Sequence, residues 1–334
     1  MFFSKNKTKK TFASSFRAGQ LSKIDMIRET QKENGLSIYS CPNFDEFQNM
    51  HASSFDITPT IVCMSVKIGM LQTVYAKKSE NINSYYVQVK PHDTILIVSN
   101  EFVSLPNYIS GYVTSRVSNV ANGFGHICTT IDPNWEGALL IGLGNPTNRT
   151  IKIDVGTSTR YSKKQTNQKI FQKKPLATLT FHYLSQPVID CKQDYSSMRT
   201  DLLQDICYTQ RRGFKAFCNR VFHRRQKKFT DYFFEYLSVH EQNMKERDGW
   251  MEFLEEFSVF DSSKPDSNKN SKYGKFASDY VIKENIFNRA KYFIENHKTL
   301  FGITLTIVLL IAFEKFLSKW DVYCTLRDMI KLLF

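Results

Sequence analysis

The chain has few of the features that build a disulfide framework or a structural zinc site. Its 7 cysteines are odd in number and scattered, and no two of them form a C-x-x-C pair, so neither a disulfide scaffold nor a zinc site is indicated. The H-x-E and P-C-x-x-C pattern of zinc deaminases is missing as well. The N-terminus has lysines but no apolar stretch after them, which argues against a cleaved secretory signal. We expect a reducing, cytosolic setting for the main domain and no metal site.

Acidic residues are in short supply relative to basic ones. The 334 residues include 45 lysines and arginines against 32 aspartates and glutamates, a formal net charge of +13. This excess favours an anionic partner such as a nucleotide, a nucleic acid or a membrane surface, and the sign of the charge does not distinguish between them. The length exceeds that of one small domain and predicts two or three units.

Proline is missing between about residue 199 and Pro265, and the residue composition of the chain changes where this proline-free stretch begins. Residues 60–185 carry short β-rich runs separated by turn residues, which is typical of a β-barrel or jelly roll. From about residue 199, charged and aromatic stretches favour helices. Asp261–Lys275, DSSKPDSNKNSKYGK, is typical of a flexible linker. The pattern predicts a mainly β domain followed by an α-helical region.

One part of the β-rich region carries an ordered set of motifs. From Pro91 to Gly137 it contains the strand SNEFVSLP, then an arginine, a glycine turn and IDPNWEG. This block resembles the centre of the dCTP deaminase/dUTPase family, and Leu21–Ile38 and Pro175–Phe181 resemble its opening helix and closing strand. The resemblance implies a distorted β-barrel of jelly-roll type at 21–190. It also implies a homotrimer with its sites at subunit contacts.

The resemblance further implies a set of ligand positions. In the family, the arginine and serines of an R-S-S motif contact triphosphate oxygens, because guanidinium and hydroxyl donors match phosphate geometry. Asp132 matches an aspartate that in dUTPases positions the attacking water. The alternatives are that Arg116 is a surface or interface residue and that Asp132 only accepts backbone N–H bonds in a turn. The implied ligand positions are Arg116, Ser118, Asn122, Gly123, Asp132 and Trp135.

Several catalytic positions of the family are lost. The deaminases use a glutamate, five residues after the glycine of IDPNWEG, to activate water and move protons, and this position is Gly142. A second arginine corresponds to Ala121, an early aspartate to Ser65 and a closing-strand glutamine to Thr178. We therefore predict no catalytic residue, with Asp132 as the acid or base if the domain is active. Mg²⁺ is expected only as a companion of a bound nucleotide.

Two basic segments lack acidic residues. The first is an insertion after Gly156, where phosphate neutralisation and base stacking would favour nucleic acid, or which is simply a solvated loop. The second covers residues 211–228 and has an apolar seam at helical spacing. It is compatible with a helix packed on a neighbour, a helix on anionic lipid, or nucleic-acid binding. The positions singled out are Arg160, Lys163, Lys164, Lys173, Lys174, Arg211, Arg212, Arg224 and Arg225.

The longest apolar run lies near the C-terminus. Thr299–Phe313 has no charge, and at about 1.5 Å per residue it spans roughly 22 Å, less than the ~30 Å hydrocarbon core of a bilayer. A buried helix is one interpretation, but the run lacks the polar face of a helix on a soluble domain. We predict a single transmembrane helix at 299–317 with the large N-terminal part in the cytoplasm. Its membrane or pore positions are Leu309, Glu314 and Lys315.

The predicted organisation therefore combines a nucleotide-like domain with a membrane segment. Its segments are a basic arm at 1–20, the nucleotide-like domain at 21–190, a helical stalk at 195–260, the linker at 261–275, a juxtamembrane helix at 276–298, the transmembrane helix at 299–317 and an amphipathic tail at 318–334. The leading hypothesis is a catalytically degenerate sensor coupled to a membrane effector, similar in architecture to bacterial anti-phage effectors. Its expected partners are a nucleotide or short single-stranded nucleic acid, membrane lipid and further copies of the chain. The alternatives are an active membrane-tethered dNTP pyrophosphatase or deaminase, and a structural oligomer without a ligand.

Overall fold

The chain divides into two compact units. In the computed structural model, unit 1 comprises Met1–Thr147 and Ile151–Glu284, and unit 2 comprises Asn148–Thr150 and Asn285–Phe334. The structure describes residues 19–40, 49–79, 82–161, 169–189, 197–209, 218, 221–240, 242–257, 281–283, 290, 292–294, 296–319 and 331. The predicted arm at 1–20, all but its last two residues, and the predicted linker at 261–275 lie outside these ranges.

Unit 1 is mainly β, and its first sheet has five strands in the order β1-β15-β9-β10, with β3 also paired to β15. These strands are β1 (Gly19–Gln20), β3 (Phe55–Ile57), β9 (Ile109–Ser115), β10 (Cys128–Ile131) and β15 (Ala177–Tyr183). All of the pairs are antiparallel. Strand β10 lies at the edge of the sheet, and its first three residues are exposed.

The second sheet also has five strands, in the order β11-β8-β4-β5, with β2 paired to β8. They are β2 (Ser37–Tyr39), β4 (Pro59–Ser65), β5 (Met70–Leu71), β8 (Asp93–Ser104) and β11 (Glu136–Asn145). Burial alternates along the first residues of β8 and becomes continuous from Ile97 to Val103. Alternation marks a strand with one solvated face, so the continuous part is covered on both faces.

A third sheet and a hairpin complete the β structure. The third sheet has the order β12-β7-β6-β16, with β6 (Val74–Ser79), β7 (Ile82–Val89), β12 (Ile151–Asp154) and β16 (Val281–Lys283). Strand β16 runs parallel to β6 and lies inside the interval 276–298, for which the sequence predicts a helix. The hairpin of β13 (Thr157–Tyr161) and β14 (Lys169–Lys173) is formed by the basic insertion.

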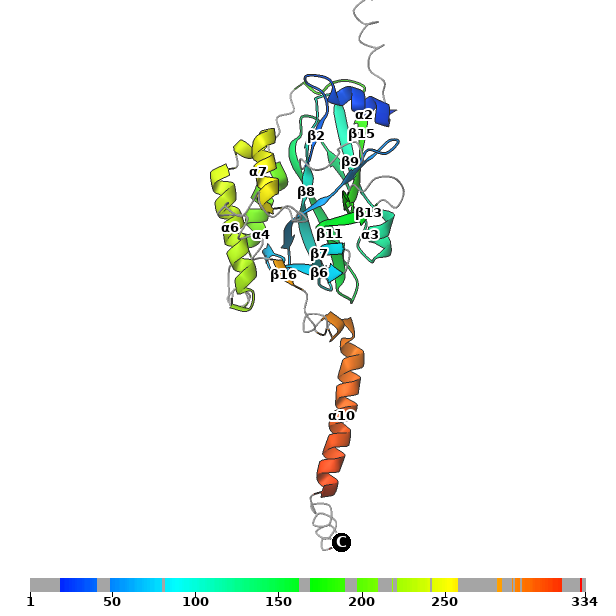
Figure 1. Ribbon diagram of the computed structural model, residues 1–334, viewed down its shortest axis with the longest axis vertical. Coiled ribbons are helices and arrows are strands. Elements are labelled where there is room, and N and C mark those ends of the chain that lie inside the picture. The colour runs from blue at the N-terminus through cyan, green and yellow to red at the C-terminus, as the bar shows by residue number, and fades with distance from the viewer. Residues whose placement is uncertain are drawn as a thin grey trace, which may run out of the picture. The chain divides into compact units, whose positions relative to one another are not determined.

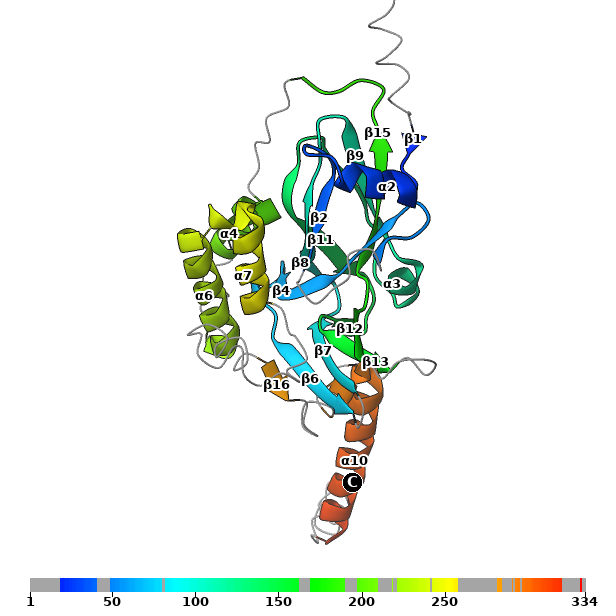
Figure 2. The ribbon, with the colours of Figure 1, turned by 45° about the horizontal axis from the view of Figure 1, so that its top comes forward.

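Helix α2 (Lys23–Thr30) begins at a capping box, in which Ser22 and Asp25 exchange side-chain and backbone hydrogen bonds. Figure 2 shows it across one end of the β domain, beside β9 and β15. Its buried Glu29 accepts hydrogen bonds from the hydroxyls of Tyr108 at 2.9 Å and Tyr183 at 2.7 Å. Burial, reinforced by the hydrogen bond to this carboxylate, raises the pKa of both tyrosines. These bonds hold α2 on the first sheet.

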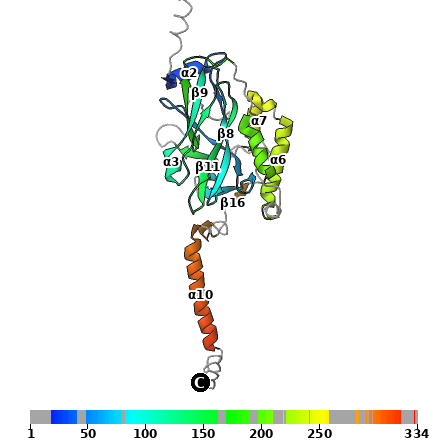
Figure 3. The same ribbon diagram turned by 180° about the vertical axis from the view of Figure 1, so that it is seen from behind.

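Three helices pack against the second sheet. They are α4 (Thr200–Thr209), preceded by the short η2 (Ser197–Arg199), then α6 (Arg224–His240) and α7 (Arg247–Phe257), with the short η3 (Asn243–Lys245) between the last two. Figures 1 and 3 show them together on the side of the sheets opposite to α3 (Val117–Ala121). The Trp250 indole N–H donates to the Asn100 carbonyl at 2.9 Å, and Leu71 N–H donates to Thr230 Oγ1 at 2.9 Å. The described residues of the segment 195–260 are thus mainly helical, but they cover the β domain where a stalk was expected.

An aromatic cluster forms the interior of this helical layer. Trp250 and Phe253 stack with ring centroids 4.6 Å apart, and Phe257 contacts both Phe253 and Phe233. All four of these rings are fully buried, so they account for the aromatic series as helix packing. Beside them, burial raises the pKa of Glu256 to about 7, the hydrogen bond from Tyr232 opposes this shift, and the charge of nearby Glu252 adds to it.

Unit 2 contains the long helix α10 (Lys298–Lys319), drawn in orange to red in Figure 1. Its residues from Gly302 to Lys315 are all exposed. Among the residues that the structure describes, no helix combines the length and the apolar character needed to cross a membrane. The transmembrane prediction for 299–317, with Leu309 as its mid-membrane position, is therefore not supported.

Candidate functional site

Arg116 stands at the junction between β9 and α3. It is the N-cap residue of this short helix, with an extended backbone and no side-chain cap bond. Its guanidinium forms an ion pair with the carboxylate of Asp56 on β3, which is 7% exposed, while the Arg116 side chain itself is 31% exposed. Arg116, the residue predicted to bind phosphate, is therefore already ion-paired with a carboxylate of its own chain.

Asp56 is held in place by further neighbours. Its Oδ2 lies 2.9 Å from Nε2 of His51, and its Oδ1 accepts a hydrogen bond from Thr178 Oγ1 at 3.2 Å. Thr178 lies opposite Asp56 in the register of β15 and β3, so strand pairing places the two side chains together. Pairs directly opposite in antiparallel strands are close enough to contact. Asp56, His51, Arg116 and Thr178 form what we call the Asp56 cluster.

Sequence reasoning missed Asp56 and assigned the family's early aspartate to the position of Ser65. Ser65 instead belongs to a separate buried pair in the second sheet, where its hydroxyl donates to Asp93 at 2.6 Å. The available signal was the triplet Phe55-Asp56-Ile57, an aspartate between two apolar residues. The structure pairs Asp56 with Arg116, so Asp56 joins the candidate site.

The other predicted positions near α3 have mainly structural surroundings. Asn122 is the C-cap of α3 and Gly123 follows it with φ of 102°, a conformation that favours glycine. Asn119 Nδ2 donates to the Leu176 carbonyl at 2.6 Å, which ties the helix to the segment before β15. Ser118 is exposed on this helix. Arg116, Ser118 and Asn122 are thus the predicted positions here whose side chains can present donors to an anion.

Asp132 and Trp135 belong to a different turn. The Trp135 N–H donates to the Asp132 carbonyl at 3.2 Å, and Asn134 has φ of 63°. The half-buried Trp135 indole donates to the Gly137 carbonyl at 3.0 Å, so its ring braces the turn. The Asp132 side chain is exposed. The turn interpretation accounts for the backbone here, and the carboxylate of Asp132 faces solvent.

Arg116 and Asp132 lie at opposite ends of one hairpin. In the antiparallel register of β9 and β10, Thr114 pairs with Cys128 and Gly111 with Ile131. Arg116 follows the last residue of β9, and Asp132 follows the last residue of β10. At about 3.3 Å per residue the two are on the order of 20 Å apart along the hairpin. Within one copy of the chain, they do not form a single site.

The position of the deaminase glutamate offers no acid or base. Gly142 lies on β11 opposite Leu96 of β8. A Cβ built at Gly142 would approach the Leu96 side chain only to 3.5 Å, an ordinary contact. The space would therefore admit a side chain, but the chain supplies none. Within the part of the chain that the structure describes, no group of three or more histidines, cysteines, aspartates or glutamates is arranged to hold a metal ion.

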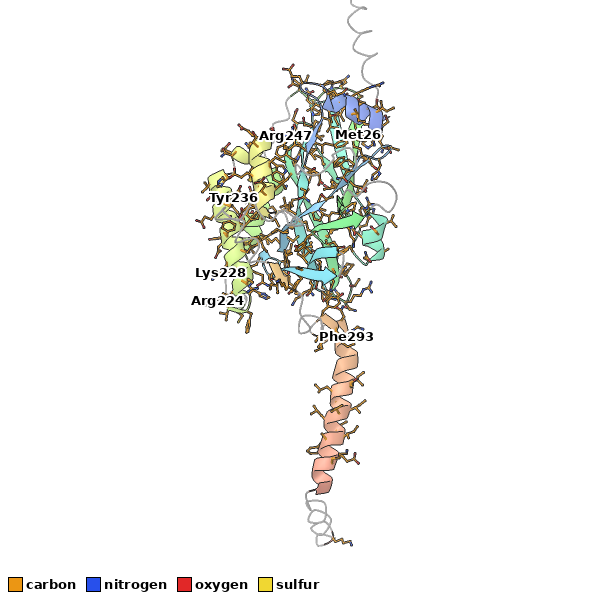
Figure 4. All side chains as sticks on the ribbon, in the orientation of Figure 1. Met26, Arg224, Lys228, Tyr236, Arg247 and Phe293 are labelled. Atoms are coloured by element: carbon orange, nitrogen blue, oxygen red, sulfur yellow. The ribbon has the colours of Figure 1, made fainter. Side chains whose placement is uncertain are left out.

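The structure describes only some of the predicted basic positions. Lys163, Lys164, Arg211 and Arg212 lie outside the described residues, and for Arg160 and Lys173 the structure gives only their places in β13 and β14. Lys174 is exposed and forms an ion pair with Asp154. Arg224 and Arg225 are exposed in the first turn of α6. Figure 4 labels Arg224 and Lys228 at this end of the helix.

The edge of the first sheet exposes apolar side chains. Val117 is 85% exposed, and Val120 and Tyr112 are exposed as well. Tyr112 pairs with Thr130 of the edge strand β10. An unpaired strand edge beside apolar side chains is a surface that proteins normally cover.

Residues 23–159 match a family model described as dCTP deaminase-like. This part of the β domain is therefore similar to dCTP deaminase-like domains. Similar solved structures include a 2'-deoxycytidine 5'-triphosphate deaminase from Agrobacterium tumefaciens, with 11% identity over 50% of this chain and 48% of that chain and a TM-score of 0.32. This chain thus spans about half the length of that deaminase. No curated protein matches the chain.

Two phage dUTPases are also similar to this domain. A mutant dUTPase from phage phi11 of S. aureus has 16% identity over 49% of this chain and 100% of that chain, with a TM-score of 0.27. A mutant dUTPase of Staphylococcus bacteriophage 80alpha, solved with dUpNHpp, has 17% identity over 49% of this chain and 91% of that chain, with a TM-score of 0.27. The family-model match supports the sequence resemblance for residues 23–159.

Proposed function

We propose that the β domain binds a deoxynucleoside triphosphate or a similar polyphosphate at Arg116 and does not deaminate it. The observation that carries the proposal is the arrangement at the start of α3, where Arg116 has a partly exposed guanidinium, Ser118 is exposed two residues later, and position 142 is glycine. A guanidinium and a hydroxyl are suitable phosphate donors. Deamination requires a group that moves protons, and glycine has none.

The proposed site is completed by a second copy of the chain. Arg116 and Asp132 lie at opposite ends of the β9–β10 hairpin, whereas the family resemblance implies that both face one nucleotide. The exposed edge at β10 and the exposed Val117 support self-association, since covering them removes apolar surface from water. In such an assembly, Asp132 of one copy would meet the Arg116 of its neighbour.

Subunit complementation tests this proposal. Arg116→Gln and Asp132→Asn variants, each purified alone, should fail to bind dCTP and dUTP. Co-expressed with different tags and purified through both, they should regain part of the wild-type binding, because some subunit contacts then contain one intact Arg116 and one intact Asp132. If the mixed assembly binds neither dCTP nor dUTP while both variants remain folded, the proposal of a site shared between two copies is wrong.

The membrane localisation remains a proposal, resting on the apolar surface of α10. Ile303, Leu305, Leu309 and Phe313 are between 48% and 60% exposed, and apolar residues cover all sides of the helix. A helix that is apolar all round is normally buried in protein or lipid. We infer that lipid covers it, and that the exposed cations of α6 contact anionic headgroups.

Fractionation of cells that express the full chain checks this part. Wild-type protein should sediment with membranes, and Leu309→Arg should shift it toward the soluble fraction, while dCTP binding by the β domain is unchanged. Wild-type protein that remains soluble contradicts the membrane proposal and leaves the nucleotide proposal intact.

A further inference from the structure

We propose that Asp56 acts as an internal competitor for Arg116, so that the anion site is closed until a di- or triphosphate displaces this carboxylate. The inference rests on the proposed function, because it concerns the same guanidinium. It adds that Asp56 determines how strongly an anion must interact with Arg116 to bind, and therefore which class of ligand can bind.

The carboxylate is the fixed partner of the pair. Asp56 is 5% exposed and lies on β3, and its two oxygens are held by Thr178 and His51 in addition to Arg116. A buried carboxylate with several donors on a short strand has little freedom to turn away. If the Arg116 side chain moves away, Thr178 and His51 remain as hydrogen-bond partners of the two oxygens, so the buried carboxylate is not left without a partner.

Arg116 is the partner that can move. Its side chain is 31% exposed, it follows the end of β9, and it makes no side-chain cap on α3. Rotation of a long side chain toward solvent therefore breaks the contact with Asp56 without breaking a strand pair. The guanidinium would then be open to an incoming ligand.

The exchange sets a requirement on the ligand. A monophosphate offers the guanidinium an anionic oxygen, as Asp56 already does through its Oδ1, so replacing one by the other gains little. A di- or triphosphate can keep that contact and place a further phosphoryl group on the exposed Ser118 hydroxyl. The site should therefore prefer polyphosphates to monophosphates and to carboxylates.

The test uses the full chain and inorganic triphosphate as the probe. Asp56→Asn keeps the size of the side chain and removes its charge. We expect it to bind triphosphate at least about tenfold more tightly than wild type, as expected for release of a charge-assisted contact. The gain should disappear in the double variant with Arg116→Gln. Inorganic monophosphate should bind more weakly than triphosphate to the wild type, with a smaller difference in Asp56→Asn.

A matched control is available in the same unit. Asp154 forms an ion pair with Lys174, so Asp154→Asn removes one negative charge and one ion pair away from Arg116. Its triphosphate affinity should remain within about twofold of wild type, since both charges are exposed or partly exposed and screened by salt. An equal gain in Asp56→Asn and Asp154→Asn would show an effect of net charge alone and overturn the inference.

A second readout does not depend on any phosphate ligand. The rate of phenylglyoxal modification at Arg116, followed by peptide mass spectrometry with exposed Arg28 as internal reference, should rise in Asp56→Asn. If no variant binds triphosphate but the modification rate of Arg116 rises in Asp56→Asn, the proposed function is wrong. Asp56 then still blocks access to Arg116. Unchanged modification, or weaker triphosphate binding in Asp56→Asn than in wild type, overturns the inference.

Discussion

The two flanks of the β domain differ in how completely their apolar and polar groups are buried or paired within one copy of the chain. On the helical flank, Trp250, Phe253 and Phe257 are fully buried and the indole N–H has a backbone partner. On the α3 flank, Val117 is 85% exposed, the first three residues of the edge strand β10 are exposed, and the Arg116 side chain of the central charge pair is 31% exposed. A flank that is complete in one copy serves stability, whereas an incomplete one is where a ligand or another copy of the chain would bind. Mutations on the two flanks should therefore have different consequences.

The largest expected effect is on the helical flank. Trp250→Ala removes a ring that stacks on Phe253 at 4.6 Å and donates to Asn100. It should lower the free energy of unfolding by about 3–5 kcal/mol, because a large cavity is left in a close-packed layer. The change is measured by urea denaturation. Val117→Ala, on the exposed flank, should stay within about 0.5 kcal/mol, and equal losses would remove the distinction between the flanks.

A pH dependence should also belong to the helical flank. The pKa of Glu256 is raised to about 7, chiefly by burial, so the folded state holds a proton that the unfolded state releases at lower pH. This contribution to stability is present below the usual glutamate pKa and is lost as the pH rises through about 7. We expect unfolding to be easier at pH 8 than at pH 4.5 by roughly 1–3 kcal/mol from this group. Glu256→Gln should remove that part of the pH dependence, and an unchanged profile would contradict the assignment.

A smaller loss is expected on the α3 flank. Gly123 has φ of 102° at the end of α3, and any side chain there meets a strained backbone. Gly123→Ala should cost about 1 kcal/mol in thermal or urea unfolding. Gly142→Ala is the comparison, because a Cβ there makes only an ordinary contact with Leu96. A larger cost for Gly142→Ala than for Gly123→Ala would contradict this description of the turn.

The smallest expected effect is a gain in stability. Arg224 and Arg225 lie in the first turn of α6, which has no acidic residue, and cations there oppose the helix dipole. Replacing each by glutamine should stabilise unit 1 by about 0.3–1 kcal/mol. The same double variant should lower the affinity for anionic vesicles. Stability that falls, with vesicle binding unchanged, would show that these arginines serve the fold.

The fold was more predictable than the site, for physical reasons. Alternating apolar residues and turn signals are local, so the strands between 60 and 185 and the helices after 199 follow from the sequence. The packing of the helices on the sheet depends on long-range contacts such as Trp250 to Asn100, which have no local signal. Periodicity therefore predicted the helices and mistook their arrangement for a stalk.

The candidate site likewise depends on long-range contacts that the sequence does not reveal. The motif around Arg116 and Asp132 was visible in the sequence, and the loss at Gly142 followed from the family spacing. The pairing of Arg116 with Asp56 depends on two strands that are far apart in sequence and adjacent in the sheet. The separation of Arg116 from Asp132 likewise follows from the register of β9 and β10, which a list of motifs does not contain.

The central claim is that this dCTP deaminase-like domain binds a nucleoside polyphosphate through Arg116 without deaminating it. The most direct measurement is an equilibrium titration of the full chain with dCTP in the presence of Mg²⁺, with chromatographic analysis of the nucleotide afterwards. We predict saturable binding that is lost in Arg116→Gln, with all dCTP recovered unchanged. Formation of dUTP or dUMP that is abolished by Asp132→Asn would contradict the claim and establish an active enzyme.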